Sequence, residues 1–458
     1  MPNKLWGGRF SKTTDPKFDK FSGSLRWDVR LLPYDLVVDR AHVNALKRCG
    51  VLSAAEAKKL LFAIGTIEKA AKRNALKFKP GSEDIHSAVH AELLRLAGPL
   101  ADKLQTARSR NDLVSQSSRL YCKEHAGRLI VLIEKFQKAI VAKAEEYQDV
   151  LVPGMTHMQN AQVLSQGHIF LAYAEMLDRS RRRMILARAL TDVCVLGSGA
   201  LAGVTFKLDQ KAMARELGLS EITRNSYDVS GDRDFVLNML SSLSFVGQHL
   251  SRIAQDLMIG QLKSVGLIDI DQSFCTGSSM MPQKKNADFL ELARGSGGVF
   301  HGNFVGFLSV VTGMPTSYNR DLQWDKHFLF DSVETAEELL EIFAALFKTL
   351  KVNEKRAKEL LSDDSLYATD LADYLVGKGV PFKKAHHQVG EIVNFAEDKG
   401  IRLSKIGLNI LKGFAPAVAD DVYRLFDAAH SVNLKKTVGS THPAQIAKQI
   451  RQWKVKLR

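Results

Sequence analysis

Residues 243 to 257 read Leu-Ser-Phe-Val-Gly-Gln-His-Leu-Ser-Arg-Ile-Ala-Gln-Asp-Leu. Along this stretch the apolar residues Leu243, Val246, Leu250, Ile253 and Leu257 are separated alternately by three and four positions. A mean spacing of 3.5 residues places them on one face of a helix. It also predicts near-parallel packing against similar helices, with a left-handed supercoil. The stretch therefore predicts a bundle of long helices.

The same spacing recurs on both sides of this stretch. It predicts long helices from about residue 112 to Val152, from Val163 to Val193 and from Lys285 to Val311, and a further helix that follows the polar residues 317–326 and ends near Leu350. Each is well over the average helix length of about 11 to 12 residues. Alternating strand patterns are nearly absent, so the predicted fold class is all-α, with an extended bundle of about five long helices.

The chain has 458 residues, which favours two or three domains over a single core. We expect a mostly helical N-terminal domain over residues 1–110 and a central long-helix bundle over residues 111–361. From about residue 362 the predicted helices shorten and turns become frequent. Residues 362–458 are therefore predicted to form a small helical C-terminal domain.

The formal net charge is +14, but the basic residues are spread along the whole chain. The densest run, Arg179 to Arg183, lies inside a helical pattern without zinc-ligand spacing, interleaved aromatics or a nucleic-acid motif. A solvated helix face or an interface is favoured, and no nucleic-acid partner is expected. A basic balance also suits acidic small substrates, which it attracts by long-range steering.

The four cysteines, Cys49, Cys122, Cys194 and Cys275, show no paired spacing, which fits a reducing compartment. The first residues contain no apolar signal segment, and no apolar run is long enough to span a membrane. A cytoplasmic protein without a membrane partner is therefore expected.

His86 and His90 stand four residues apart and could share a helix face. No glutamate general base lies between them and no third ligand is evident, so we expect no metal. A place near a substrate or structural hydrogen bonding is favoured for this pair. The Gly-rich stretch at residues 196–203 has no preceding strand and no Lys-Ser/Thr end, so it is a poor phosphate loop.

A polar loop interrupts the helices at residues 276–286, which read Thr-Gly-Ser-Ser-Met-Met-Pro-Gln-Lys-Lys-Asn. Pro282 suits the start of a helix, so Lys284, Lys285 and Asn286 are predicted to lie in its first turn. Cations at that end oppose the helix dipole, and together with free N–H groups they favour an anion. The alternative is a solvated basic turn, which would not need two Met residues and a Pro.

Three other polar breaks lie at helix ends, over residues 108–112, 156–160 and 317–326. Together the breaks offer hydroxyls, amides, a histidine, lysines and arginines, with no metal-ligand set and no cofactor fingerprint. Such groups suit a polyanionic substrate and acid/base chemistry that requires no cofactor.

Gly277 to Asn286 matches the Gly-Ser-Ser-x-Met-Pro-x-Lys-x-Asn signature of the fumarase/aspartase superfamily. The ending Gln283-Lys284-Lys285-Asn286 resembles the argininosuccinate lyase family within that superfamily. Further segments that resemble this family, from one end of the chain to the other, are residues 6–10, 109–112, 232–235, 318–321 and 368–375.

The resemblance implies reversible β-elimination of argininosuccinate to arginine and fumarate. It implies that Ser278 removes a proton from the carbon beside a carboxylate, helped by the positive charge of Lys284. It assigns His157 as the acid that protonates the departing guanidinium nitrogen, and Glu291 as the carboxylate that tunes this histidine.

The resemblance also implies a homotetramer with a twenty-helix core, in which each active site collects loops from three subunits. A helix rises 1.5 Å per residue, so loops at opposite ends of long helices need other subunits in order to converge. The implied substrate-binding residues are Ser24, Arg110, Asn111, Thr156, Asn286, Tyr318, Gln323 and Lys326.

Some residues depart from the family pattern, namely Asn160, Val163, Gly231 and Ala287, but none of them removes a proposed catalytic group. Two other functions stay open. One is a structural protein on the same scaffold, like the lens crystallins that resemble this family. The other is a sister lyase that releases fumarate from adenylosuccinate, malate or aspartate. Use in arginine synthesis or in nitrogen disposal is also left open.

Overall fold

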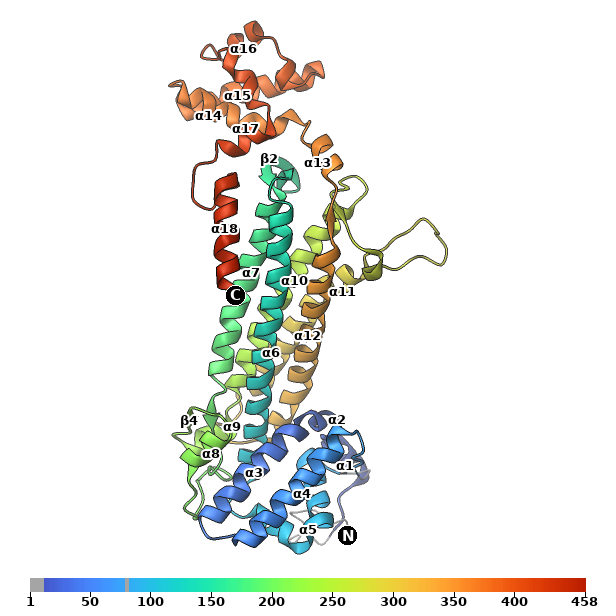
Figure 1. Cartoon of the computed structure of the whole chain (residues 1–458), viewed down its shortest axis with the longest axis vertical. Coiled ribbons are helices and arrows are strands. Elements are labelled where there is room, and N and C mark those ends of the chain that lie inside the picture. Colours follow the sequence, from blue (N-terminus) through green and yellow to red (C-terminus); the bar gives the residue numbers. More distant parts are fainter. Residues whose placement is uncertain (1–11, 79–81) are drawn as a thin grey trace. The chain divides into compact units, whose positions relative to one another are not determined.

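The computed structural model describes residues 12–78 and 82–458, and its fold is all-α with a few short strands (Figure 1). The chain folds into two compact units. Unit 1 comprises Met1–Val131, Ser180–Gly247 and Gly297–Glu337, and unit 2 comprises Leu132–Arg179, Gln248–Ser296 and Glu338–Arg458. The division into three continuous domains stays a prediction.

The predicted long helices are confirmed in the described part of the chain. They are α6 (Arg110–Glu146), α7 (Gln166–Ala189), α10 (Asp234–Gln261), α11 (Asp288–Val311) and α12 (Asp325–Thr349). Their lengths are 37, 24, 28, 24 and 25 residues. The five apolar residues from Leu243 to Leu257 that predicted α10 are all buried. Each long helix contributes one part to unit 1 and the other part to unit 2.

In unit 1 the long helices are joined by specific contacts. Ser244 on α10 donates a hydrogen bond to the Phe300 carbonyl oxygen on α11 over 3.2 Å. A Cβ on Gly247 would lie 2.2 Å from the Phe300 ring, so only glycine allows these two helices to approach so closely. His125 on α6 pairs with Glu337 on α12 at 2.8 Å. The bundle therefore closes through both polar and apolar contacts.

Shorter elements complete unit 1. A capping box formed by Ser53 and Glu56 starts α4. Asp84 caps α5 by accepting the Ser87 N–H. The helices are α1 (Pro16–Ser22), α2 (Leu25–Asp28), α3 (Leu32–Arg48), α4 (Ala54–Lys72), α5 (Ile85–Ala97), α8 (Gln210–Glu216) and α9 (Ser226–Gly231), with the 3-10 helices η2 (Val29–Leu31), η3 (Gly98–Gln105) and η5 (Arg320–Trp324). The strands β3 (Val193–Cys194) and β4 (Glu221–Ile222) pair in parallel.

Aromatic rings dominate the core of unit 2. Phe136 on α6 stacks on Phe343 of α12 at 5.3 Å between ring centroids, and Phe170 on α7 meets Phe347 edge-on at 5.8 Å. The buried Gln137 side chain donates to the Ala174 carbonyl oxygen over 3.0 Å, which satisfies one of its polar groups.

The predicted helix ends between α6 and α7 were wrong. Helix α6 ends at Glu146, and β1 (Leu151–Thr156) then pairs with β2 (Gln159–Ser165) in an antiparallel hairpin. Pro153 and Gly154 fall within β1, although both residue types are uncommon inside strands, so the sequence does not show a strand pattern there. A β-bulge follows Gly154. Tertiary pairing therefore overrides the helical pattern on both sides of this turn. Strands β5 (Ile268–Asp269) and β6 (Lys351–Val352) are also antiparallel.

The C-terminal part of unit 2 consists of shorter helices, as the sequence predicted, and some of them pack around Leu371, Leu375, Ile392 and Leu411. The helices are α13 (Glu354–Leu360), α14 (Ala368–Gly377), α15 (Phe382–Lys399), α16 (Leu408–Phe414), α17 (Ala428–Asn433) and α18 (Pro443–Lys456), with the 3-10 helices η6 (Asp364–Tyr367), η7 (Leu403–Lys405) and η8 (Asp420–Leu425). Lys454 on α18 pairs with Glu145 on α6, which ties the last helix to the first long one.

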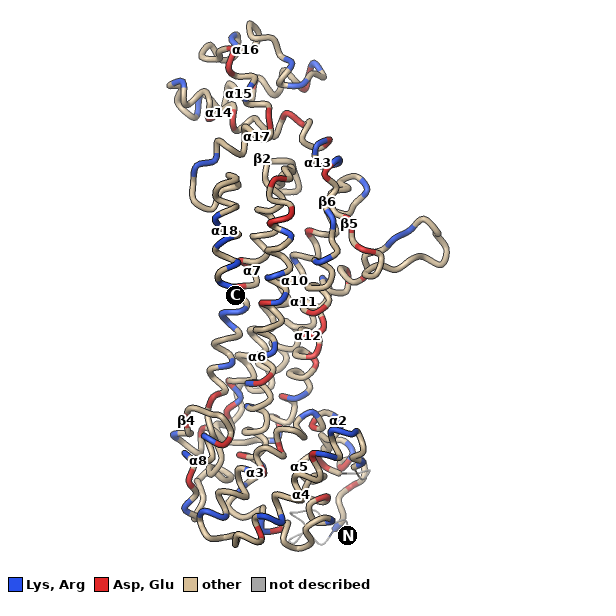
Figure 2. The backbone as a smooth tube through the Cα atoms, in the orientation of Figure 1, with Lys and Arg blue, Asp and Glu red and all other residues tan. Residues whose placement is uncertain are grey.

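Charged residues of both signs occur along the whole described backbone and form no single block (Figure 2). The predicted basic run Arg179–Arg183 begins and ends within α7. No helix among the described residues is long and apolar enough to cross a membrane. The four cysteines, Cys49, Cys122, Cys194 and Cys275, are free thiols in the described chain.

Candidate active site

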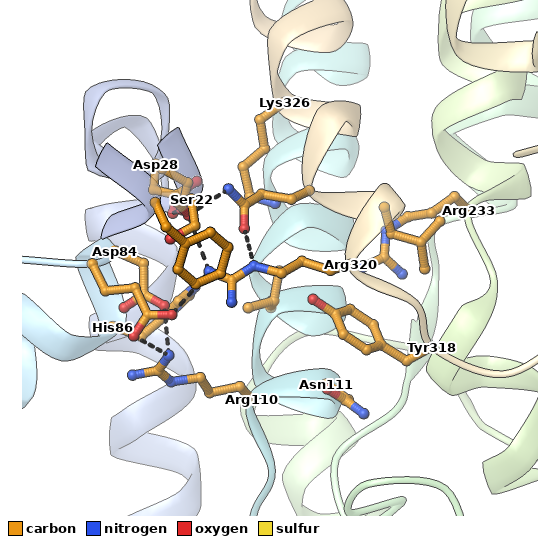
Figure 3. A pocket seen from close by; sticks show the side chains of 16 residues that line it. Ser22, Asp28, Asp84, His86, Arg110, Asn111, Arg233, Tyr318, Arg320 and Lys326 are labelled. Carbon is orange, nitrogen blue, oxygen red and sulfur yellow. Dashed lines mark hydrogen bonds and ion pairs between the residues drawn. The ribbon is translucent and has the colours of Figure 1, made fainter. Parts of the chain in front are cut away.

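Unit 1 contains a cavity of about 430 Å³ beside the start of α6 (Figure 3). Six residues that the sequence proposed for substrate binding line it together, although they come from three separate stretches of the chain. They are Ser24, Arg110, Asn111, Tyr318, Gln323 and Lys326. Helix starts and short connecting segments therefore converge here, as expected of a site built from polar breaks.

Arg110 is the first residue of α6, and its guanidinium points toward the start of α5. It lies 3.3 Å from Glu83 and 3.2 Å from Asp84, and it donates a hydrogen bond to Ser87 over 2.6 Å. Burial alone would raise the pKa of Asp84, but the charges of His86 and Arg110 hold that pKa below its usual value. Asp84 is therefore a fixed anion in the cavity wall.

Arg320 enters the cavity from η5, and in Figure 3 its side chain and that of Arg110 extend toward the side where Asp84 lies. Its guanidinium lies 3.0 Å from Glu83 and donates to the Ser22 carbonyl oxygen over 3.0 Å. Gln323 donates to the same carbonyl over 2.9 Å. These contacts connect α1, the start of α5 and η5 at one side of the cavity.

Lys326 belongs to a buried charged cluster in the wall of the same cavity. It donates to Asp325 over 2.9 Å, and Arg233 donates to the second Asp325 oxygen over 2.7 Å. Burial would raise the pKa of Asp325, but these two cations outweigh it and lower the pKa. Asp28, which accepts a hydrogen bond from Ser24, has its pKa raised by burial in spite of nearby Lys326. The cluster keeps a cation at the cavity wall.

His86 lines the same cavity and forms an ion pair with Asp35 through Nδ1. Burial would lower the pKa of His86, but Asp35 outweighs burial and raises that pKa. Ser117 also donates to Asp35, so the pair is fixed from two sides. His86 thus combines a structural hydrogen bond with a place beside the cavity. Within residues 12–78 and 82–458, no cluster of His, Cys, Asp and Glu is arranged to hold a metal ion.

Asn111 reaches the cavity from the first turn of α6 and donates through Nδ2 to the Ala200 carbonyl oxygen over 3.0 Å. The adjacent Asp112 accepts the N–H groups of Gly197 and Gly199 at 3.3 and 2.9 Å. Burial raises the pKa of Asp112 to about 6. The Gly-rich stretch therefore binds a carboxylate of its own chain, which agrees with its poor match to a phosphate loop.

The remaining predicted site residues belong to unit 2. Thr156 and His157 lie at the tip of the β1–β2 hairpin, where His157 and Met158 have φ angles of 53° and 62°. Two successive residues in the left-handed region form a tight two-residue hairpin turn, which exposes the His157 side chain. This backbone conformation is unfavourable for residues other than glycine. His157 lines a second, mostly apolar cavity of about 340 Å³.

The signature loop differs from the prediction. Thr276 and Asn286 form a two-way backbone bridge at 2.9 and 2.8 Å, and α11 begins only at Asp288. Asp288 and Glu291 occupy its first turn, as the helix dipole favours. Lys284 and Lys285 therefore lie in a closed loop and do not oppose the dipole. Pro282 turns the loop and does not start the helix.

Within that loop, Ser278 accepts the N–H groups of Met280 and Met281 at 3.3 and 3.1 Å. Both donors would stabilise negative charge on the Ser278 oxygen. Lys284, Asn286 and Glu291 line a wide cavity of about 770 Å³ at the base of the loop, where Lys285 pairs with Asp269 at 2.8 Å. The loop is therefore an electropositive segment with a supported hydroxyl.

Nearly the whole chain matches known proteins. Residues 8–302 match the family model described as Lyase, and residues 365–433 match the one described as Argininosuccinate lyase C-terminal. The argininosuccinate lyase of Caldicellulosiruptor bescii is 42% identical over 447 residues, which are 98% of this chain and 97% of that protein. The chain belongs to the argininosuccinate lyase family. The Bacillus licheniformis argininosuccinate lyase is 41% identical over 451 residues, 98% of each chain.

A solved structure supports the same fold for this argininosuccinate lyase family member. A variant of EDDS lyase with bound fumarate superposes with a TM-score of 0.85 at 25% identity, covering 98% of this chain and 91% of that chain. The predicted all-α, multi-domain fold is thus confirmed.

The described chain gathers half of the family's predicted site residues in one cavity and holds the other half in unit 2. The catalytic roles of Ser278, His157, Lys284 and Glu291 stay predictions. Sequence reasoning missed several charged cavity residues, namely Asp28, Glu83, Asp84, Arg233 and Arg320. Four of them stood in polar segments that had been singled out, beside His86, before Asp234 and after Tyr318, so their neighbours were a usable signal.

Proposed function

We propose that the chain catalyses the reversible β-elimination of argininosuccinate to arginine and fumarate. The observation that carries this proposal is the convergence of six predicted substrate-binding residues on one charged cavity. The cavity presents both guanidinium groups and carboxylates, which suits a substrate that has several carboxylates and a guanidinium. Relatives with the name argininosuccinate lyase, and the related EDDS lyase with bound fumarate, support the same assignment.

In the proposed mechanism, Ser278 acts as an alkoxide that removes a proton from the carbon beside a carboxylate. The electron pair moves into that carboxylate, and Lys284 balances the added charge. The N–H groups of Met280 and Met281 support the alkoxide, since both already donate to the Ser278 oxygen. The C–N bond then breaks as His157 protonates the guanidinium nitrogen, and Glu291 tunes His157. Thr156 and Asn286 would hold the substrate beside these groups.

We propose further that the active form is a cytoplasmic homotetramer with a twenty-helix core, and that it needs no cofactor. Helix α11 carries exposed Val299, Val305 and Leu308 on more than one face, and packing against other copies would bury these apolar side chains. In this assembly, the Ser278 loop and the His157 hairpin of other copies complete the cavity around Arg110. Arginine synthesis is the proposed cellular use.

One assay tests the activity and its alternatives. The purified protein is offered argininosuccinate, adenylosuccinate, malate or aspartate, and the release of fumarate is followed. We expect fumarate from argininosuccinate alone. Fumarate from one of the other substrates in its place would identify a sister lyase. No fumarate from any of the four would favour a structural protein on this scaffold.

A further inference from the structure

A carboxylate of the chain lies between the two guanidinium groups that face the cavity. One oxygen of Glu83 lies 3.0 Å from Arg320, and the other lies 3.3 Å from Arg110. The Glu83 side chain is 17% exposed, against 30% for Arg110 and 47% for Arg320. Glu83 is thus partly shielded, whereas both arginines remain open to a ligand that enters the cavity.

The neighbouring Asp84 has a different task. Its Oδ1 atom accepts the backbone N–H and the hydroxyl of Ser87, which caps α5, and its other oxygen faces Arg110. Removal of Asp84 would therefore disturb the start of a helix. The carboxylate of Glu83 makes no such cap with Ser87. Its two oxygens are arranged as the carboxylate of a bound ligand would be, with one guanidinium on each.

We propose that Glu83 is a built-in competitor that occupies Arg110 and Arg320 until a carboxylate of the ligand replaces it. The proposal rests on the proposed function, because it takes the natural ligand to be carboxylate-rich. Glu83 thereby sets specificity: a ligand must carry a carboxylate placed to engage both guanidinium groups in order to displace it. A ligand that meets only one arginine leaves Glu83 in place and gains little.

The competition predicts an unusual direction of change. Removal of a residue that positions the ligand weakens ligand binding, whereas removal of a competitor strengthens it. Glu83→Gln keeps the size of the side chain and removes its charge, so Arg320 loses this carboxylate partner and Arg110 keeps only Asp84. A like charge at contact distance in water costs about 1 kcal/mol, which corresponds to about fivefold in affinity.

The test is titration calorimetry with succinate, an unreactive dicarboxylate, on the full-length wild type and the Glu83→Gln variant. We expect Glu83→Gln to bind succinate about fivefold more tightly at low ionic strength. The gain should shrink as salt is added, because both charges are partly exposed. The matched control is Glu334→Gln, which removes an equally charged partner of Arg30 outside the cavity and should bind succinate as the wild type does.

A second comparison separates competition from a general change in charge. In an Arg320→Gln background, Glu83→Gln should gain less affinity than it does alone, because one of the contested guanidinium groups is absent. Succinate binding to Glu83→Gln that is unchanged or weaker than in the wild type would overturn the proposal. Succinate binding is measured without turnover, and fumarate release from argininosuccinate is assayed separately. A failure of this proposal can therefore be told apart from a failure of the proposed function.

Discussion

Lys326 donates a hydrogen bond to Asp325 over 2.9 Å, and the side chains are only 5% and 1% exposed. Arg233 holds the other oxygen of the same carboxylate. Two buried cations thus depend on one anion, and a buried charge without its partner is costly. The Asp325 carboxylate compensates the charges of Lys326 and Arg233, and this cluster supports the cavity wall.

Asp325→Asn should therefore destabilise the protein strongly. Removal of the shared carboxylate leaves Lys326 and Arg233 buried without the anion that both of them contact, at a cost of about 3 to 5 kcal/mol. Urea unfolding would measure this as a lower midpoint at a similar slope. The control is Glu334→Gln at the exposed Arg30 pair, where a change within about 1 kcal/mol is expected. Equal effects of both substitutions would contradict this role for Asp325.

Gly247→Ala should also destabilise the bundle, for a steric reason. The added Cβ would lie 2.2 Å from the ring of the fully buried Phe300, which has no open space to move into. Such overpacking typically costs about 1 to 3 kcal/mol. Gly390→Ala in α15 is the matched control, because nothing lies within 4 Å of its new Cβ. That control should gain about 0.5 to 1 kcal/mol, so thermal unfolding should shift in opposite directions.

His42 should make the protein sensitive to acid. Burial first, and then the charge of Arg108, lower the pKa of His42 from 6.5 to about 3. His42 therefore becomes protonated below about pH 6.5 in the unfolded chain, but only near pH 3 in the folded chain. The contribution to stability is full above pH 6.5 and is lost as the pH falls toward 3. The slope attributable to His42 approaches about 1.4 kcal/mol per pH unit.

Unfolding free energies measured from pH 7 to 4 would check this slope. In His42→Gln the corresponding part of the slope should disappear, since glutamine does not titrate. His387→Gln is the matched control, because it removes an imidazole from a largely exposed position on α15. A slope that stays the same in His42→Gln would show that other groups govern the acid response.

The helical framework was predictable because burial follows the helical period, as the row from Leu243 to Leu257 shows. The hairpin at Pro153 and the loop at Lys284 were not predictable in the same way. Both depend on pairing between backbone segments, seen in the bridge from Thr276 to Asn286, and backbone pairing leaves little trace in the side chains. The site residues came from polar helix ends and a family resemblance, whereas the place of Glu83 between Arg110 and Arg320 emerged only from the structure.

Ser278→Ala should abolish turnover and leave the fold intact. The Ser278 side chain accepts two N–H groups in a loop, so its loss costs little stability, while the proposed base disappears. We expect turnover of argininosuccinate to fall by roughly a thousandfold or more. Circular dichroism and size-exclusion chromatography would establish that the variant is still folded and assembled. Ser279→Ala is the matched control in the same loop, and normal turnover in Ser278→Ala would show that the base is wrongly assigned.

Mixed assemblies test whether active sites are shared between copies of the chain. Ser278→Ala and His157→Asn subunits should each be inactive alone, because each lacks one of the two proposed proton-transfer groups. If every site takes Ser278 and His157 from different chains, random equimolar assembly gives about a quarter of the sites both groups. Denaturing and refolding the two variants together should restore about that fraction of wild-type activity, while separately refolded samples that are then combined without exchange should not. Verified mixed tetramers that release no fumarate would exclude a site that combines Ser278 and His157 from different chains.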